Sequence, residues 1–293
     1  MEIRVLKYFL TVVHEESITK AAEILHITQP TLSRQLMDLE EELGAKLFTR
    51  GKSRITLTEE GRLLRRRAEE IVDLASKTER EFGEQNNLIG GEISIGAGES
   101  YVMHVLADLM KKFSKDYPLV KYNLYSGNAD DIKERIDKGL IDIGLLMEPV
   151  NIDKYDFVRL TQKETWGVIM RKDSLLSDKE YITTEDLSQK PILLTKRSIV
   201  QEEFKNWFGA GYDKLKVIAT FNLIYNAAIM VTECLGYAVT LENLVNTYDE
   251  TDICFKPFYP KMETGSVIAW KKHQVFSVTV TKFIERVKET FKE

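Results

Sequence analysis

The sequence contains few of the residues that usually build a metal centre, a disulfide framework or a nucleophilic active site. It has only two cysteines, Cys234 and Cys254, and four histidines, and neither residue type occurs at the spacing of metal ligands. No nucleophile elbow, phosphate-binding loop or dinucleotide fingerprint is present. We therefore predict a protein that is not an enzyme and that uses no metal and no cofactor.

Long hydrophobic runs are also absent. No apolar stretch approaches the length that spans a membrane, and charges interrupt the apolar residues at positions 1–7, unlike a secretory signal. The small number of cysteines suits a reducing compartment. These features predict a cytoplasmic protein that has no membrane partner.

Charge is distributed unevenly along the chain. The net charge is −5, which by itself argues against binding to nucleic acid. Residues 1–67, however, contain 12 Lys and Arg against 10 Asp and Glu, a net +2, so the remaining residues carry −7. Because local charge sets the attraction to phosphates, the total does not exclude a DNA-binding head on an acidic body.

Residues 28–44 have the pattern of a helix that is buried along one side. Thr28 can cap its start, and Gly44 can end it in a left-handed conformation. The apolar face consists of Leu32, Leu36, Leu39 and Leu43. The opposite face of the first two turns carries Gln29, Thr31, Ser33, Arg34 and Gln35. These groups can bond to base edges in a DNA major groove, although an ordinary surface helix has a similar pattern.

The residues around this stretch complete a winged helix-turn-helix arrangement. The predicted elements are helices over residues 2–14, 18–25 and 29–43 and a hairpin wing over residues 47–57. Ser17 can cap the second helix, and the small side chains of Ala21 and Ala22 allow two helices to cross closely. The third helix is then the recognition helix.

The chain here resembles the LysR-type bacterial transcriptional regulators. The matching residues are Phe9, Ser17, Thr19, Ala21, Ala22, Leu25, residues 29–36, Leu39, Glu40, residues 42–44, Leu47, Phe48, Arg50, residues 56–58, Glu60 and Gly61. The resemblance implies a regulator that binds double-stranded operator DNA. The residues implied to contact it are Gln29, Pro30, Thr31, Ser33, Arg34, Arg50 and Arg54. Arg50 could instead brace the wing.

A long helix with a heptad seam follows the wing. The seam residues are Leu64, Ala68, Ile71, Ala75, Thr78 and Phe82. One helix that protrudes from a small head cannot bury this seam, so we predict pairing with the same helix of a second subunit. Packing on the protein's own body is the alternative. The resemblance implies a homodimer at this helix and, in many relatives, a homotetramer.

Beyond residue 91, strand and helix patterns alternate, which predicts parallel sheets covered by helices on both faces. The resemblance implies an α/β effector domain with two lobes, like a periplasmic binding protein, and a ligand cleft between them. A solute-binding transport protein would share this body but not the head. The predicted domains are a winged head (1–58), a linker helix with a hinge (59–89) and an effector-binding domain (90–293). Lobe one is placed at 92–162 and 268–293, and lobe two at 163–267.

Ligands of open α/β sheets bind beyond the carboxyl ends of the strands. The predicted effector contacts at such positions are Ser100, Tyr101, Ser126, Asn128, Met147, Thr195 and Tyr225. Any polar residue among them could instead cap a helix. Glu99 and Glu148 could repel a carboxylate or pair with an amino group, so the charge of the ligand stays open.

The mode of regulation also follows from the resemblance. A small-molecule effector would shift the arrangement of the subunits and so the spacing of the heads on DNA. RNA polymerase is a further partner if the protein activates transcription. Some relatives sense oxidants through a cysteine pair. Cys234 and Cys254 lie in separate segments, and no basic cluster flanks Cys234, so we favour a small-molecule effector.

Overall fold

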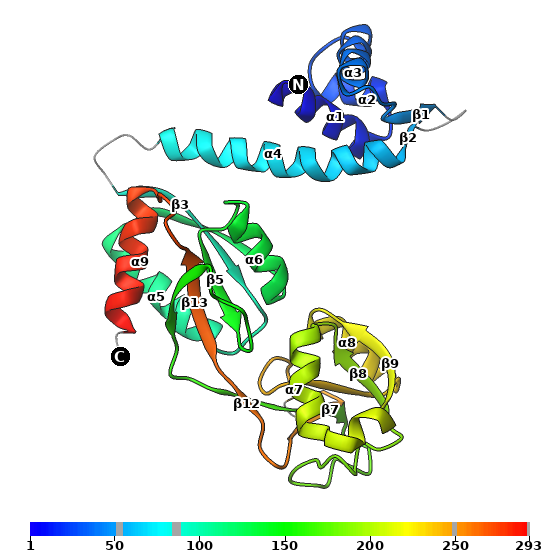
Figure 1. The fold of residues 1–293 in the computed structure, drawn as a ribbon, viewed down its shortest axis with the longest axis vertical. Coiled ribbons are helices and arrows are strands. Elements are labelled where there is room, and N and C mark those ends of the chain that lie inside the picture. Colours follow the sequence, from blue (N-terminus) through cyan, green and yellow to red (C-terminus); the bar gives the residue numbers. More distant parts are fainter. Residues whose placement is uncertain (51–54, 84–88, 248–250, 292–293) are drawn as a thin grey trace. The chain divides into compact units, whose positions relative to one another are not determined.

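The structure is a computed structural model that describes residues 1–50, 55–83, 89–247 and 251–291. It divides the chain into two compact units, Met1–Gln85 and Asn86–Glu293. Each unit has its own hydrophobic core. Figure 1 labels the elements of both units.

The first unit is the predicted winged helix-turn-helix followed by a long helix. Its elements are α1 (Ile3–Glu15), α2 (Ile18–Ile24), α3 (Gln29–Leu43), β1 (Phe48–Arg50), β2 (Ile55–Leu57) and α4 (Glu59–Gly83). Strands β1 and β2 are antiparallel, as expected of a wing. The side chain of Ser17 accepts a hydrogen bond from the backbone of Lys20, and Gly44 ends α3 with a φ of 64°. Both predicted helix ends are therefore confirmed.

Helix α4 packs on the head over its first half. Ala68 is fully buried, and Leu64 and Ile71 pack against the same core as Phe9 of α1. This differs from the expectation that the seam is buried only against a second subunit, because α1 supplies an apolar face alongside α4. Farther along the seam Ala75 is half-buried and Thr78 is exposed, whereas the side chain of Phe82 lies outside the described residues.

The second unit contains two α/β lobes. Lobe one consists of β3 (Gly90–Ala97), α5 (Met103–Asp116), β4 (Leu119–Ser126), α6 (Ala129–Asp137), β5 (Ile143–Met147), β6 (Tyr155–Arg159), β13 (Ser266–Lys271) and α9 (Val278–Thr290). Lobe two consists of β7 (Glu164–Arg171), β8 (Pro191–Thr195), α7 (Ser198–Phe208), the short 3₁₀ helix η1 (Gly209–Lys214), β9 (Lys216–Phe221), α8 (Ile224–Thr232), β10 (Tyr237–Leu241), β11 (Ile253–Pro257) and β12 (Glu263–Thr264).

Both sheets are mixed, so the prediction of parallel sheets is correct only for part of each sheet. Lobe one has the strand order β4-β3-β5-β13-β6, and lobe two has the order β11-β7-β10-β8-β9 with β12 paired to β7. Strand β13 runs antiparallel to β5 and β6, and β7 runs antiparallel to β10 and β11. The reversed strands β7 and β13 directly follow the two crossovers. The second crossover is at Gly265, because Thr264 still pairs with lobe two and Ser266 already pairs with lobe one.

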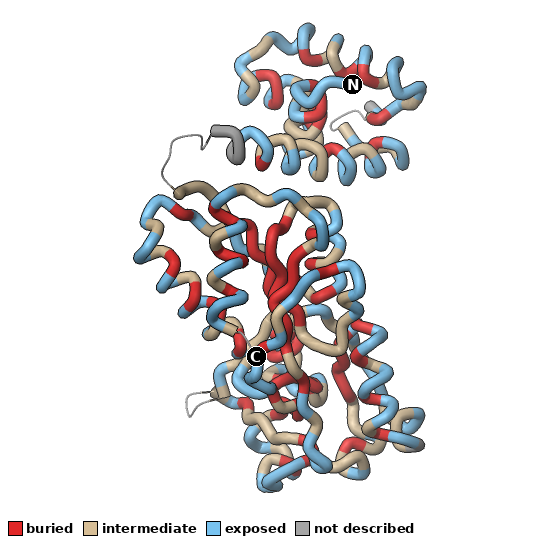
Figure 2. Tube along the Cα trace, turned by 60° about the vertical axis from the view of Figure 1, so that its left-hand side comes forward, coloured by how far each residue is buried: buried red, intermediate tan, exposed pale blue. Residues whose placement is uncertain are grey.

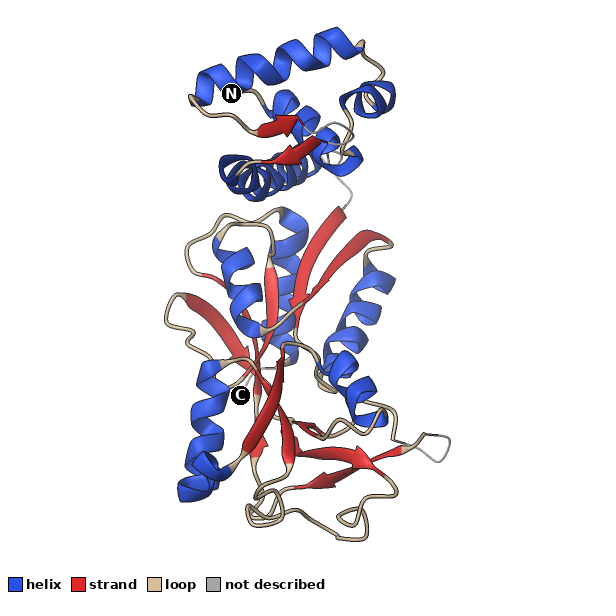
Figure 3. Ribbon diagram, turned by 90° about the vertical axis from the view of Figure 1, so that its right-hand side faces the viewer, coloured by secondary structure: helices blue, strands red, loops and turns tan. Residues whose placement is uncertain are grey.

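Helices cover both faces of each sheet (Figure 3), so the strands carry most of the buried residues (Figure 2). In lobe one, α5 and α9 pack on one face and α6 packs on the other. In lobe two, α7 packs on one face and α8 on the other. Each lobe is therefore a sheet covered by helices on both faces, as predicted.

Candidate functional site

Helix α3 presents a polar face to solvent. Thr28 caps the helix, with its hydroxyl accepting from Thr31 N at 3.4 Å and lying 2.8 Å from the Thr31 hydroxyl. Leu32, Leu36 and Leu39 are buried against α1 and α2, whereas Leu43 is exposed. Burial of the three leucines points the opposite face of the helix outward.

The predicted DNA contacts of α3 lie on this outward face. Gln29, Pro30, Thr31 and Arg34 are exposed and Ser33 is half-buried. The side chains of Gln29, Ser33 and Arg34 form no hydrogen bond or ion pair with any described residue. Their polar groups are therefore available to an external partner, as a major-groove helix requires. Arg54 and the side chain of Arg50 lie outside the described residues.

Glu40 ties the wing to α3. Its carboxylate accepts from the backbone of Leu47 at 2.8 Å and of Phe48 at 3.4 Å, and from Lys46 Nζ at 2.7 Å. Burial raises the pKa of Glu40, but these donors outweigh that effect and hold it below the ordinary value. Glu40 thus stays ionised and fixes the first wing strand beside the recognition helix.

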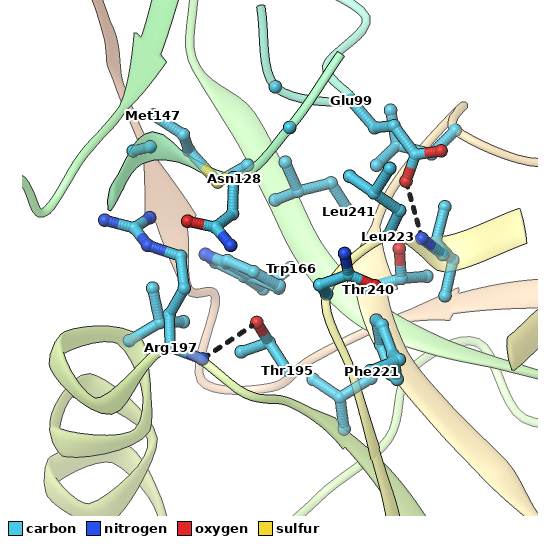
Figure 4. Close-up of a pocket in the computed structure, with 18 of the residues that line it drawn as sticks. Glu99, Asn128, Met147, Trp166, Thr195, Arg197, Phe221, Leu223, Thr240 and Leu241 are labelled. Carbon is cyan, nitrogen blue, oxygen red and sulfur yellow. Dashed lines mark hydrogen bonds between the residues drawn. The ribbon is translucent and has the colours of Figure 1, made fainter. Parts of the chain in front are cut away.

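A pocket of about 70 Å³ lies between the two lobes of the second unit. Its polar lining consists of Glu99, Asn128, Thr195, Arg197, Asn222 and Thr240. The rest of the lining is mainly apolar and includes Met147, Trp166 and Leu241. Figure 4 shows Arg197 and Asn128 on one side and Glu99 on the opposite side, with Trp166 between them.

The pocket brings together only some of the predicted effector contacts. Asn128, Met147 and Thr195 line it. Ser100, Tyr101 and Ser126 instead line a neighbouring, more open cavity of about 410 Å³. Tyr225 lines neither, and it is 68% exposed. The predicted residues that follow strands therefore line two different cavities, depending on the direction of their side chains.

Ser100 faces away from the pocket because it is held by Glu164. The carboxylate of Glu164 accepts from the Ser100 hydroxyl at 2.6 Å and from Tyr101 N at 2.7 Å. Burial raises the pKa of Glu164, and its hydrogen-bond donors only partly offset that effect. The contact joins the start of β7 in lobe two to the segment after β3 in lobe one.

Asn128 caps α6. Its side-chain oxygen accepts from the backbone of Asp130 at 2.9 Å and of Asp131 at 3.1 Å, and its amide nitrogen donates to the Asp131 carboxylate at 2.6 Å. The capping alternative weighed for the polar residues therefore holds for Asn128. The residue also lines the pocket, where α6 begins.

Arg197 is the positive charge of the pocket. Its Nη2 donates to Pro149 O at 3.1 Å, and its Nε lies 3.5 Å from the carboxylate of Asp130, which is half-exposed. Burial lowers the pKa of Arg197, and Asp130 opposes this effect. Arg197 is not among the predicted effector contacts, and its neighbour Lys196 is exposed.

Two acidic residues had left the ligand charge open, and the structure separates them. Glu99 lines the pocket, but its carboxylate accepts from Ile224 N at 2.5 Å at the start of α8. Glu148 lines no part of the pocket and pairs with Arg159 at 2.9 Å. Sequence reasoning missed Trp166 and Thr240 as pocket residues, because alternation along β7 and β10 does not show which face turns to the other lobe.

The cysteines and histidines form no comparable site. The described residues contain no cluster of His, Cys, Asp and Glu side chains suited to a metal ion. Both thiols are free, and burial raises the pKa of Cys254. The ring of His104 lies 4.6 Å from that of Tyr101, outside the pocket. In the described part of the chain no helix has the length and apolar character needed to cross a membrane.

Comparisons with known proteins agree with this architecture. Residues 3–62 match the family model "Bacterial regulatory helix-turn-helix protein, lysR family", and residues 86–292 match "LysR substrate binding domain". The chain is 27% identical to the uncharacterized HTH-type transcriptional regulator YcgK of Bacillus subtilis (strain 168), over 100% of this chain and 96% of YcgK. It is 34% identical to AlsR of the same organism over 66% of this chain and 64% of AlsR.

Solved structures share the fold over the full length. CbnR, a LysR family transcriptional regulator, superposes with a TM-score of 0.78 at 20% identity and with full coverage of both chains. HinK, a LysR family transcriptional regulator from Pseudomonas aeruginosa, gives 0.57 at 22% identity over 99% of this chain and 98% of HinK. With the head and the two-lobed body both matched, this chain belongs to the LysR family and is a DNA-binding transcriptional regulator with an effector-binding domain.

Proposed function

We propose that the protein reads an operator through α3 and that a small molecule between the lobes controls this binding. The observation that carries the proposal is the pocket, which is lined from lobe one by Asn128 and Met147 and from lobe two by Trp166 and Arg197. A ligand that contacts both lobes stabilises one arrangement of the lobes over others, and it shifts the population by its differential affinity.

The DNA side of the proposal rests on the free polar groups of α3. Ser33 and Arg34 would contact bases or phosphates, together with Gln29, Pro30 and Thr31 of the same helix. The wing residues Arg50 and Arg54 would contact the adjacent DNA. Full-length CbnR has been solved in a complex with its target DNA. That complex supports operator binding as the role of the equivalent head here.

Assembly is the third part of the proposal. Helix α4 leaves Leu63 and Leu74 55% and 42% exposed, whereas Leu64, Ala68, Ile71 and Val72 pack on the head. The two exposed side chains are suited to a homodimer contact, and two heads would then bind two half-sites of a dyad-symmetric operator. A tetramer, a cytoplasmic location and contact with RNA polymerase extend the same proposal, and we propose no catalysis and no membrane partner.

Selection from a random library of duplex DNA by the purified full chain, at a stated salt concentration, tests this function. We expect enrichment of one interrupted palindrome. Recovery of unrelated sequences in a strongly salt-dependent manner would contradict sequence-specific reading. The selected duplex then serves to measure how candidate ligands change DNA affinity.

A further inference from the structure

The pocket contains a hydrogen-bond donor that has no acceptor in the protein. Trp166 is only 5% exposed, and its indole N–H, which can only donate, bonds to no described residue. Figure 4 shows the indole nitrogen turned toward the side of the pocket that carries Arg197 and Asn128. A ligand that fills the pocket must accept from this N–H, because a donor that is buried without a partner loses its hydrogen bond to water.

The guanidinium of Arg197 adds further donors at the same place. The residue is only 8% exposed, and its Nη1 bonds to no described residue. Its one carboxylate neighbour, Asp130, is 3.5 Å away and half-exposed, so solvent screens much of the attraction. Arg197 is also the N-cap residue of α7, and its side chain does not cap that helix start. The partial positive charge of that helix end adds to the charge of the guanidinium.

Two buried hydroxyls complete the donor set. Thr195 and Thr240 both line the pocket and are 9% and 3% exposed. The Thr195 hydroxyl accepts from Arg197 N at 3.4 Å, so its own hydrogen remains available. The Thr240 hydroxyl bonds to no described residue. Thr195 thus adds a hydroxyl donor on the side of Arg197, and Thr240 adds one on the side of Glu99 (Figure 4).

The one acidic group in the lining does not neutralise the charge of Arg197. Glu99 lies on the opposite side of the pocket from Arg197 (Figure 4), and its carboxylate is bound to Ile224 N at the start of α8. The helix end offsets its charge. Glu99 also shows that a carboxylate is stably accommodated at a helix start within this lining.

Size limits the remainder of the ligand. The cavity of about 70 Å³ is less than half of the roughly 150 Å³ engineered apolar cavity that holds benzene. Its walls around the donors are apolar and include Met147, Val239 and Leu241. A short aliphatic chain fits this volume, whereas an aromatic ring does not fit without rearrangement.

We infer that the effector pocket takes a small aliphatic monocarboxylate, whose carboxylate accepts from Arg197 and the Trp166 indole and whose chain lies against Met147 and Leu241. This inference rests on the proposed function, because it names the ligand class of the same pocket. The Thr195 hydroxyl, next to Arg197, supplies a further donor to the carboxylate. Charge-assisted hydrogen bonds of this kind are the strong ones in proteins.

Thermal unfolding of the full chain, titrated with sodium acetate, propanoate and butanoate at constant ionic strength, tests the inference. Propanamide and propylamine serve as neutral and cationic probes of similar shape. We expect saturable stabilisation by the carboxylates alone. Arg197→Gln should weaken the apparent affinity for the carboxylates at least about 10-fold. Trp166→Phe keeps an aromatic ring but removes the N–H, and it should weaken that affinity a few-fold. Lys196→Gln makes the same charge change on the exposed neighbour and should leave the affinity unchanged.

Several outcomes would overturn the inference. The first is stabilisation by propylamine or propanamide but not by propanoate. The second is wild-type affinity in both the Arg197→Gln and Trp166→Phe variants. The third is that no carboxylate stabilises the protein. A separate measurement distinguishes the proposed function. If propanoate binds with the expected dependence on Arg197 but leaves affinity for the selected operator duplex unchanged, the ligand class stands and the regulatory role of the pocket fails.

Discussion

The hydroxyl of Ser100 lies 2.6 Å from the carboxylate of Glu164, to which it donates a hydrogen bond. Ser100 follows the first strand of lobe one, and Glu164 begins the first strand of lobe two. The same carboxylate accepts from Tyr101 N at 2.7 Å. The bond holds the two lobes together beside the pocket and explains why Ser100 does not line it.

Glu164→Gln should change how the stability of the body depends on pH. Burial raises the pKa of Glu164 above its ordinary 4.5 in the folded state, so the folded state binds the proton more tightly than the unfolded one. Its contribution is complete below about pH 4.5 and is lost as pH rises through the raised pKa. Thermal unfolding from about pH 4 to 8 should show the wild type losing stability relative to Glu164→Gln. A pH-independent difference would refute this assignment.

Arg34→Ala and Ser33→Ala should weaken specific DNA binding without unfolding the head. A good contact to a base edge contributes about 1–3 kcal/mol, so Arg34→Ala should lower the affinity roughly 5- to 150-fold. Fluorescence anisotropy with the selected operator duplex measures the loss. Arg4→Ala removes the same charge from the exposed face of α1 and is the control. Equal losses in the Arg4 and Arg34 variants would show that α3 contributes only general charge.

Substitutions on the two sides of α4 should have different consequences. Ala68→Glu places a charge in the core of the head, where Ala68 is fully buried, and should destabilise the head by more than about 3 kcal/mol. Leu74→Glu changes an exposed side chain, so the head should remain folded while the dimer dissociates at least about 10-fold more readily. Sedimentation velocity and thermal unfolding separate the two effects. A dimer unaffected by Leu74→Glu would place the contact elsewhere.

Gly61→Ala should destabilise the head. A Cβ atom at this position would lie 2.1 Å from the carbonyl oxygen of Leu47 and 2.9 Å from the side chain of Leu57. The backbone of the wing would have to shift, at a cost of about 1–3 kcal/mol. Gly211→Ala, where the nearest atom is 3.9 Å away, is the matched control. Equal melting temperatures for both variants would contradict the close approach.

Asn128→Ala should reduce the stability of the body through α6. Loss of the cap oxygen costs about 0.5–2 kcal/mol, whereas Asn128→Ser supplies another hydroxyl cap and should restore most of it. If carboxylate binding is restored together with stability in the serine variant, Asn128 acts on the pocket through α6. If only stability is restored, the amide itself contacts the ligand.

The amino-acid sequence by itself determined the elements of the head and their ends. Helical periodicity and the caps at Ser17, Thr28 and Gly44 are local signals, so the three helices of the head agree with the structure to within one residue. The alternation of strands and helices likewise predicted an α/β body, whereas its division into two lobes was implied by the family resemblance. Such features depend on residues a few positions apart, which a single sequence displays directly.

Only the tertiary structure decided which side chains meet. The direction of β7 and β13 follows from the crossovers, which also set Glu164 against Ser100 and turn Trp166 and Arg197 into the pocket. In the same way, α1 covers the first half of the α4 seam, although the spacing of that seam alone suits a second subunit equally well. An apolar face of a strand or helix is buried against an apolar surface of another element. That element is distant in sequence, so the sequence pattern of the face alone does not identify it.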